Sequence, residues 1–334
     1  MNCFRFAPLL VAAFFLACSA QKHGDGMPLH MIIDAGSSGT RVCLFGVASS
    51  SGRCRAFDTT FGCKDVPARG GLADQGAGAR ATVEKALGMV SPEELRRVQA
   101  AALLGTGGFR RIPEFQQKAV LASAGEAFQN TSFPGTLKVL SGEDEGSLAW
   151  LALGERTGSD EHAIVEIGGA TVQIAAGKRG SVRNISTKDG MNDSAKKLTE
   201  QSPCFTSRGK ACISDVQAKI FASSALGGFS ASLSPAEKAL PLYGLGAPWN
   251  AVFARAKQSE MSVADLAKQT DEVCALSVES LKASMPEEHA NRACYLHSYA
   301  LELLKITGAA RIRQGGESWP RGAAVSGQYF SACK

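Results

Sequence analysis

The feature that most constrains the fold is a short pattern that occurs twice in the chain. In Ile32–Ser38 an apolar run ends at an acid, Asp34, and a turn of glycine and small or hydroxyl residues follows. In Val165–Thr171 the same order returns, with Glu166 as the acid. The two acids lie 132 positions apart, close to the length of one domain. Such an internal repeat predicts a duplicated domain.

The rest of the chain alternates helical and extended patterns. Apolar spacing predicts helices at 79–89, 92–98, 114–129, 145–153, 214–224, 263–269, 278–284 and 292–306, and strands at 30–34, 42–47, 100–104, 137–140, 163–167 and 172–176. The stretch 177–197, rich in Gly, Ser and Lys, is predicted to be a loop. The alternation favours an α/β fold.

The first twenty residues have the order of a signal peptide. Arg5 precedes an apolar stretch, 6–17, and small residues follow at 18–20, too short a run to span a bilayer core of about 30 Å. Cleavage after Ala20 would release a soluble protein, whereas cleavage before Cys18, in a sequence that resembles a bacterial lipobox, would leave a lipid anchor. Both alternatives stay open, and both predict a secreted, periplasmic or surface location.

Ten cysteines are present, without a CxxC motif and with five histidines, which argues against a zinc site. In an exported protein cysteines typically form disulfides. We expect the local pairs Cys54–Cys63, Cys204–Cys212 and Cys274–Cys294. Cys43 lies in a strand pattern and is predicted to be a buried free thiol.

Composition excludes some classes of protein. Hydrophobic residues make up 45% and charged residues 20% of the chain, which is typical of a globular protein rather than a disordered one. The net charge is +5 and no run of Lys and Arg occurs, so a nucleic-acid partner is not expected. A mild positive charge suits an anionic substrate.

The segment DAGSSGTR is the strongest chemical signal. Glycines in a tight turn let backbone N–H groups converge on phosphate oxygens, and hydroxyls add donors. The predicted phosphate-binding residues of this turn are Gly36, Ser37, Ser38, Gly39, Thr40 and Arg41. Asp34, at the end of the strand, can hold a hydrated divalent ion. The spacing is not that of a P-loop. The alternative to a phosphate-binding turn is a polar hairpin with an Asx turn, which would have a structural role only.

The second copy supplies another such turn, with Gly168, Gly169, Ala170 and Thr171 as its predicted phosphate-binding residues. Two facing turns would grip a polyphosphate, which is most of what phosphoryl transfer requires. Between them the segment SGEDEG carries Glu143, Asp144 and Glu145. One of these carboxylates could accept a proton from attacking water; the alternative is an acidic helix N-terminus favoured by the helix dipole. Thr106, in GTGGFR, could offer a hydroxyl to a phosphate.

These motifs resemble those of the ecto-nucleoside triphosphate diphosphohydrolases, the apyrase family. The matching segments, in the family's order, are DAGSSGTR at 34–41, GTGGFR at 105–110, SGEDEGSLAW at 141–150, VEIGGATVQI at 165–174 and, less specifically, FASSA at 221–225 and ESWPRGAA at 317–324. The first, third and fourth are specific, and the likeness extends from about residue 31 to 325.

The resemblance implies an actin-like, ribonuclease-H-like fold with the nucleotide between two related domains. The implied domains are 28–161, completed by 312–334, and 162–311, after a signal peptide at 1–20. It also implies Mg²⁺- or Ca²⁺-dependent hydrolysis of nucleoside triphosphates and diphosphates to monophosphates, without a phosphoenzyme.

The resemblance also assigns roles to residues. By position, Glu145 is the base, Gln173 helps to place water, and Asp34 and Glu166 orient the metal through water. Thr106 joins the residues that hold phosphate. For the nucleobase, Phe221, Phe229 and Arg292 are candidates. The chain lacks the terminal membrane helices on which some relatives build tetramers, so a monomer is expected.

Two departures from the family pattern stand out. Glu166 and Thr171 replace the family's Asp and Ser, and the longer Glu side chain leaves the choice of metal ion open. The Tyr that the family pattern places in a stack on the nucleobase is missing. Rival interpretations are an exopolyphosphatase or guanosine pentaphosphate phosphohydrolase, which share the fold, and a silent nucleotide-binding surface protein, against which Glu145 argues. A sugar kinase is disfavoured by the export signal.

Overall fold

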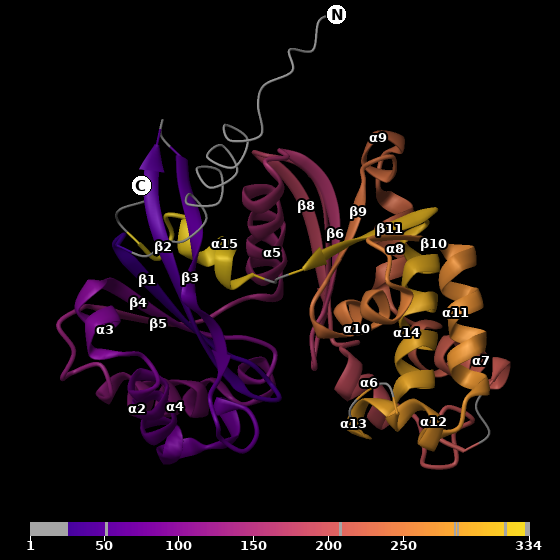
Figure 1. Cartoon of the computed structure of the whole chain (residues 1–334), viewed down its shortest axis with the longest axis horizontal. Coiled ribbons are helices and arrows are strands. Elements are labelled where there is room, and N and C mark those ends of the chain that lie inside the picture. Colours follow the sequence, from indigo (N-terminus) through magenta and orange to yellow (C-terminus); the bar gives the residue numbers. More distant parts are fainter. Residues whose placement is uncertain are drawn as a thin grey trace, which may run out of the picture.

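Two mixed β-sheets face each other across a central pair of helices, as Figure 1 shows for the computed structural model. The structure describes residues 26–50, 53–206, 209–283, 285, 287–316 and 319–330. The predicted signal peptide, with Cys18, lies outside the described residues.

The first sheet has the strand order β3–β2–β1–β4–β5. Its strands are β1 (Leu29–Ala35), β2 (Thr40–Ser50), β3 (Arg53–Asp65), β4 (Val98–Gly105) and β5 (Gly135–Val139). The first three strands are antiparallel neighbours, whereas β4 runs parallel to β1 and β5 parallel to β4. Residues of β1 alternate between two hydrophobic cores, with Met31 and Ile33 in one and Ile32 in the other, because successive side chains of a strand point to opposite faces.

The second sheet repeats this topology. Its order is β10–β11–β9–β6–β7–β8, with β6 (Glu161–Ile167), β7 (Val172–Lys178), β8 (Ser181–Thr187), β9 (Leu242–Leu245), β10 (Glu260–Ser262) and β11 (Arg311–Gly316). Apart from β10, an added edge strand, the order and directions of β8–β7–β6–β9–β11 match those of the first sheet. The duplicated pattern in the sequence therefore corresponds to two copies of one α/β unit.

Helices α5 (Gly142–Thr157) and α15 (Pro320–Val325) lie between the two sheets (Figure 1). They pack against each other in a shared core that contains Leu148 and Leu153 of α5 and Ala323 of α15. Strand residues of both sheets, among them Ile32 and Ile164, complete this core. Both sheets are thus held against one helical layer.

The outer faces of the sheets are covered by the other helices. In the first unit these are α2 (Ala79–Gly88), α3 (Pro92–Arg97) and α4 (Glu114–Glu126); in the second they are α6 (Met191–Lys197), α7 (Lys210–Val216), α8 (Ala225–Ser232), α9 (Pro235–Lys238), α10 (Ala247–Ala256), α11 (Val263–Ala275), α12 (Val278–Lys282), α13 (Glu287–Ala290) and α14 (Ala293–Thr307). Tyr295 and Tyr299 of α14 are fully buried in the outer core of the second unit. None of the helices in the described ranges is long and apolar enough to span a membrane.

The stretch 177–197 is not the loop that the sequence predicts. It contains β8 and α6, joined by a short turn. β8 is an edge strand whose side chains are mostly half-buried, and such a strand leaves only a weak hydrophobic alternation in the sequence. The domain boundaries remain a prediction, and the second sheet extends through β11 to Gly316.

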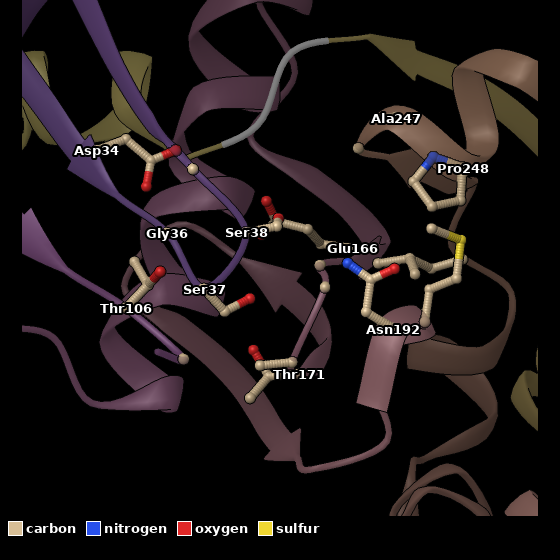
Figure 2. Close-up of a pocket in the computed structure, with 18 of the residues that line it drawn as sticks. Asp34, Gly36, Ser37, Ser38, Thr106, Glu166, Thr171, Asn192, Ala247 and Pro248 are labelled. Atoms are coloured by element: carbon tan, nitrogen blue, oxygen red, sulfur yellow. The ribbon is translucent and has the colours of Figure 1, made fainter. Parts of the chain in front are cut away.

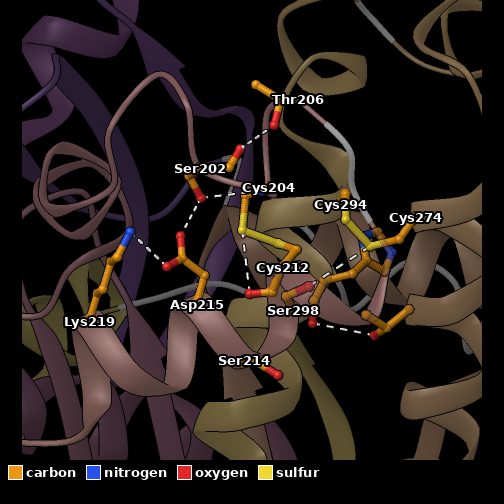
Figure 3. The surroundings of a disulfide bond; sticks show 12 residues. Ser202, Cys204, Thr206, Cys212, Ser214, Asp215, Lys219, Cys274, Cys294 and Ser298 are labelled. Carbon is orange, nitrogen blue, oxygen red and sulfur yellow. Dashed lines mark hydrogen bonds and ion pairs between the residues drawn. A yellow bond between two sulfur atoms is a disulfide. The ribbon is translucent and has the colours of Figure 1, made fainter.

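Three disulfides lie in the described part of the chain. Cys204–Cys212 and Cys274–Cys294 confirm the expected pairs, and Figure 3 shows the first of them beside the ion pair of Asp215 and Lys219. The pairing Cys54–Cys63 and the free thiol at Cys43 are wrong, because Cys63 is bonded to Cys43. The register of β2 and β3 places these two residues opposite each other, with Cα atoms 4.0 Å apart. Cys54, also disulfide-bonded, lies at the far end of the same hairpin.

Candidate active site

A cleft of about 390 Å³ lies between the two units, and both repeated turns line it (Figure 2). The cleft brings together most of the predicted site residues: Asp34, Gly36, Ser37, Ser38, Gly39, Arg41, Thr106, Glu145, Glu166, Gly168, Gly169, Ala170 and Thr171. Thr40 and Gln173 are buried beside the cleft and do not line it. Segments more than 100 residues apart thus converge on one space, as the resemblance implies.

The first turn, Gly36–Gly39, connects β1 and β2 and is supported closely from behind. A Cβ at Gly71 would lie 2.5 Å from the carbonyl oxygen of Gly36, and one at Gly108 would lie 2.9 Å from the Cα of Ser37. Any side chain at these two positions would push the turn out of place. Thr106 begins the segment behind the turn, and its N–H donates to the carbonyl of Ala35 at 3.2 Å.

The second turn, Gly168–Thr171, connects β6 and β7 and is held by the segment 190–193. The N–H groups of Met191 and Asn192 donate to the carbonyls of Gly168 and Gly169, at 2.9 and 2.8 Å. Gly190 packs so closely that a Cβ there would lie 2.2 Å from the Thr171 nitrogen. Four backbone hydrogen bonds from the segment 190–193 therefore fix this turn, whose own residues are small.

The two turns nearly touch. A Cβ at Gly169 would lie 2.9 Å from Ser37 Oγ, 3.3 Å from Ser38 Oγ and 3.0 Å from the side-chain nitrogen of Asn192. Figure 2 shows the hydroxyls of Ser37 and Thr171 pointing toward each other from opposite turns. Hydroxyls of both units and the amide of Asn192 thus border one small volume, which is an arrangement suited to a phosphoryl group.

Glu145 lies in the first turn of α5 and is 6% exposed. Ser141 caps this helix, because its hydroxyl accepts a hydrogen bond from the backbone N–H of Asp144. Successive residues of a helix point in different directions, so the three neighbouring acids point away from one another. Only Glu145 of the three lines the cleft; Asp144 pairs with Lys138, and Glu143 is exposed. Burial raises the pKa of Glu145 to about 7, although the guanidinium of Arg110 lowers it.

Arg110 lies in the site although no sequence pattern predicts a role for it. Its Nη2 donates to Glu145 Oε2 at 2.8 Å and to Thr171 Oγ1 at 3.2 Å, and its Nη1 donates to the carbonyl of Leu140 at 2.9 Å. The only sequence signal was its place in the segment GTGGFR. Arg110 therefore links the acid of α5 to the second turn.

Gln173 is fully buried behind Glu145. Its amide nitrogen lies 3.2 Å from Glu145 Oε2, 2.9 Å from Thr171 Oγ1 and 3.3 Å from Ser186 Oγ. Gln173 thus fixes the carboxylate of Glu145 and the hydroxyl of Thr171 relative to each other.

Asp34 and Glu166 end equivalent strands and are 7% and 4% exposed. The same hairpin register places Arg41 opposite Asp34 and Gln173 opposite Glu166. Arg41 Nη2 lies 2.6 Å from Asp34 Oδ2, and this ion pair is the main reason why the pKa of Arg41 is raised. Asp65, at the end of β3, also lines the cleft and adds to this effect.

The donor set at this end of the cleft consists of oxygen ligands. Among the described residues, no three His, Cys, Asp or Glu side chains lie close enough to enclose a metal directly. Two carboxylates from facing strands, with Ser38 beside them, fit a hydrated Mg²⁺ or Ca²⁺ ion, which keeps several of its waters. The residues therefore fit the metal that the resemblance implies.

The candidates for nucleobase contacts fall in different places. Phe221 is buried against Tyr299, with ring centroids 5.1 Å apart, and Phe229 packs on the same outer core under Arg183. Neither lines the cleft. Arg292 reaches it only through Asn192, to whose side-chain oxygen it donates at 3.1 Å. The end of the cleft away from Asp34 is instead lined by Ala247 and Pro248 (Figure 2), and Met191, Asn192 and Asn250 line the cleft as well.

Comparison with solved structures shows the fold of the chain. Solved structures with the same fold include a Ppx/GppA protein from Aquifex aeolicus (TM-score 0.63, 15% identity, covering 89% of this chain and 95% of that one). Nucleoside triphosphate hydrolases from Neospora caninum give a TM-score of 0.52 at 12% identity, covering 93% of this chain and 91% of that one. At these identities the likeness establishes the fold, which is actin-like, as expected.

Curated relatives match by sequence over part of their length. Probable apyrase 5 from Arabidopsis thaliana is 35% identical over 167 residues, which are 43% of this chain and 33% of the relative. The human nucleoside diphosphate phosphatase ENTPD5 is 27% identical over 157 residues, 43% of this chain and 37% of the relative. The chain thus spans about a third of the length of the curated relatives that it matches. The sequence model of the GDA1/CD39 (nucleoside phosphatase) family matches residues 25–205, more than half of the chain. The chain therefore belongs to the GDA1/CD39 (nucleoside phosphatase) family.

Proposed function

We propose that the protein hydrolyses the terminal phosphate of nucleoside triphosphates and diphosphates and stops at the monophosphate. The observation that carries this proposal is the position of Glu145, whose buried carboxylate lies beside two facing phosphate-binding turns. Its pKa of about 7 suits a general base, because a base works best when its pKa is near the working pH.

In the proposed reaction, Ser37, Ser38, Gly169 and Thr171 hold the terminal phosphoryl group. Glu145 accepts a proton from a water that Gln173 helps to place. The water oxygen forms a bond to phosphorus as the bridging P–O bond breaks, and the electron pair leaves with the shorter nucleotide. A divalent ion bound through water to Asp34 and Glu166 would offset the charge that develops on the phosphate oxygens. No covalent intermediate with the protein is needed.

Substrate choice depends on the far end of the cleft. Met191, Ala247 and Pro248 offer apolar contacts, and the amides of Asn192 and Asn250 offer hydrogen bonds. We propose that the nucleoside lies there. The relatives are named as apyrases, a nucleoside diphosphate phosphatase and a guanosine-diphosphatase, so tri- and diphosphates are both proposed substrates.

We also propose that the protein acts outside the cytosol, as a secreted or surface protein. The three described disulfides support this, because disulfides persist in oxidising compartments. Cell fractionation of the full chain, with globomycin to block lipoprotein processing at Cys18, would separate the released and the lipid-anchored forms.

The test of the activity is a phosphate-release assay on the purified full chain. ATP, ADP, GTP, UDP and long-chain polyphosphate are compared with Mg²⁺, with Ca²⁺ and with EDTA. We expect release from the nucleotides, its loss in EDTA and no release from AMP. Efficient hydrolysis of polyphosphate without nucleotide hydrolysis would instead support an exopolyphosphatase, and no hydrolysis at all would support a silent nucleotide-binding protein.

A further inference from the structure

A second cavity, of about 260 Å³, adjoins the nucleotide cleft. Gly107, Ala170 and Thr171 line both spaces, so the two cavities meet at the point where the first and second units touch. A Cβ at Gly107 would lie 2.7 Å from that of Ala170, which shows how closely the two units approach each other here. The second cavity therefore opens beside the predicted position of the terminal phosphate.

The second cavity is lined by residues that contact the groups proposed to hold the attacking water. In phosphoryl transfer the attacking and leaving oxygens are roughly in line, so the water approaches from the side opposite the nucleotide. Arg110 lines the second cavity, and it contacts both Glu145 and Thr171. Ser186 also lines it and contacts Gln173. The second cavity therefore borders the groups that are proposed to hold the water.

The charge of the lining suits an anion leaving by this route. Arg110, Arg111 and Lys188 line the cavity, against two acids, Glu143 and Asp193. Arg111 pairs with Asp193 across the interface between the units at 3.2 Å, whereas Lys188 is exposed at the mouth. The volume is below the roughly 300 Å³ at which pockets begin to hold drug-sized ligands, so it suits water and orthophosphate better than a second nucleotide.

We propose that the second cavity admits the attacking water and releases orthophosphate. The inference rests on the proposed function, and it adds an order of events: the phosphate leaves through this side while the nucleotide product still occupies the cleft. Positive charge at the mouth draws the dianion outward. Lys188 is then a binding residue for the departing phosphate, without contact to the nucleotide.

The experiment compares the rate of bond cleavage, measured by rapid quench, with the rate at which free phosphate appears, measured with a fluorescent phosphate-binding protein. The variants are Lys188→Glu and, as a charge-matched control, Lys178→Glu, which lies on β7 and lines neither cavity. In Lys188→Glu we expect phosphate release to slow by about threefold to tenfold, the size of a surface charge effect, and to fall behind cleavage. The control should match the wild type.

A second variant, Thr187→Trp, narrows the cavity without changing its charge, and it too should slow release more than cleavage. Orthophosphate added as an inhibitor should bind less tightly to Lys188→Glu than to the control. If release keeps pace with cleavage in both variants, and phosphate inhibition is unchanged, the inference is wrong. If the wild type cleaves no nucleotide, the proposed function fails instead, so the two failures are distinct.

Discussion

The guanidinium of Arg110 and the carboxylate of Glu145 meet at 2.8 Å, although 35 residues separate them in the sequence. Arg110 comes from the turn after β4, and Glu145 from the first turn of α5. The same guanidinium group contacts Thr171 of the other unit. This one side chain therefore helps to position the proposed base and opposes the rise in its pKa that burial causes.

The pKa of Glu145 predicts the pH dependence of activity. Burial raises this pKa to about 7, and Arg110 opposes the rise. The base must be ionised to accept a proton, so kcat/KM should be low below pH 7 and rise to a plateau above it. Arg110→Met removes the group that lowers the pKa, so the rise should move to higher pH.

Arg111→Met is the matched control for this shift. Arg111 is the next residue, but it pairs with Asp193 rather than with Glu145, so it should move the profile far less. Profiles of kcat/KM from pH 5 to 9 for the three proteins measure the effect. A profile for Arg110→Met that coincides with that of the wild type would contradict the role of Arg110.

Glu145→Gln should abolish turnover and leave nucleotide binding nearly intact. The amide preserves size and can still accept from Arg110, but it cannot take a proton. Loss of a general base costs about 10²–10⁴-fold in rate. Glu143→Gln is the control, because Glu143 is exposed and lines the second cavity rather than the cleft that holds Glu145. Single-turnover rates and calorimetric binding of a non-hydrolysable analogue separate the two effects; a larger loss in the Glu143 variant would reassign the base.

Arg41→Met should tighten the binding of a divalent ion in the absence of nucleotide. Arg41 occupies the Asp34 carboxylate at 2.6 Å, so an ion that uses this carboxylate competes with a tethered positive charge. The pair is partly exposed, which limits the expected gain to about twofold to tenfold. Electron paramagnetic resonance of Mn²⁺ measures it, with the exposed Arg96→Met as control. Equal affinities in all three proteins would remove Asp34 from the metal site.

Gly190→Ala should displace the second turn although no predicted phosphate-binding residue is itself substituted. The added Cβ would lie 2.2 Å from backbone atoms of Ala170 and Thr171, and inserted atoms of this kind typically cost about 1–3 kcal/mol. We expect a lower melting temperature and a higher KM for nucleotide. Gly227→Ala, on α8 with open space around it, should neither lower the melting temperature nor raise KM, because alanine favours a helix over glycine; equal behaviour of the two variants would mean that the segment 190–193 does not hold the turn.

Features encoded in consecutive residues were predictable from the sequence. Both glycine turns and their acids follow directly from strand–turn–strand patterns, and the repeat itself implies two units with one topology. Glu145 could be placed near the phosphates because the family resemblance fixed its position before Gly146. The actin-like fold was expected on the same grounds, and it is confirmed.

Features that depend on register or on distant contacts were not predictable. The bond between Cys43 and Cys63 requires the pairing of β2 with β3, and the spacing of cysteines does not reveal it. Asp65 reaches the cleft for the same reason, because it lies opposite Arg41 in that register. Pro248, at the far end of the cleft, belongs to α10, which carries no recognisable motif.

The most direct test of the account is a ³¹P NMR time course of ATP hydrolysis in ¹⁸O-labelled water with Mg²⁺, for the wild type and Glu145→Gln. Direct attack by water on the terminal phosphorus predicts that ADP appears first and AMP last. Each released phosphate should carry one labelled oxygen, and neither nucleotide should carry any. The Glu145→Gln protein should be slower by about 10²–10⁴-fold. Label in the nucleotide products, or equal rates for the two proteins, would contradict hydrolysis by a water that Glu145 activates.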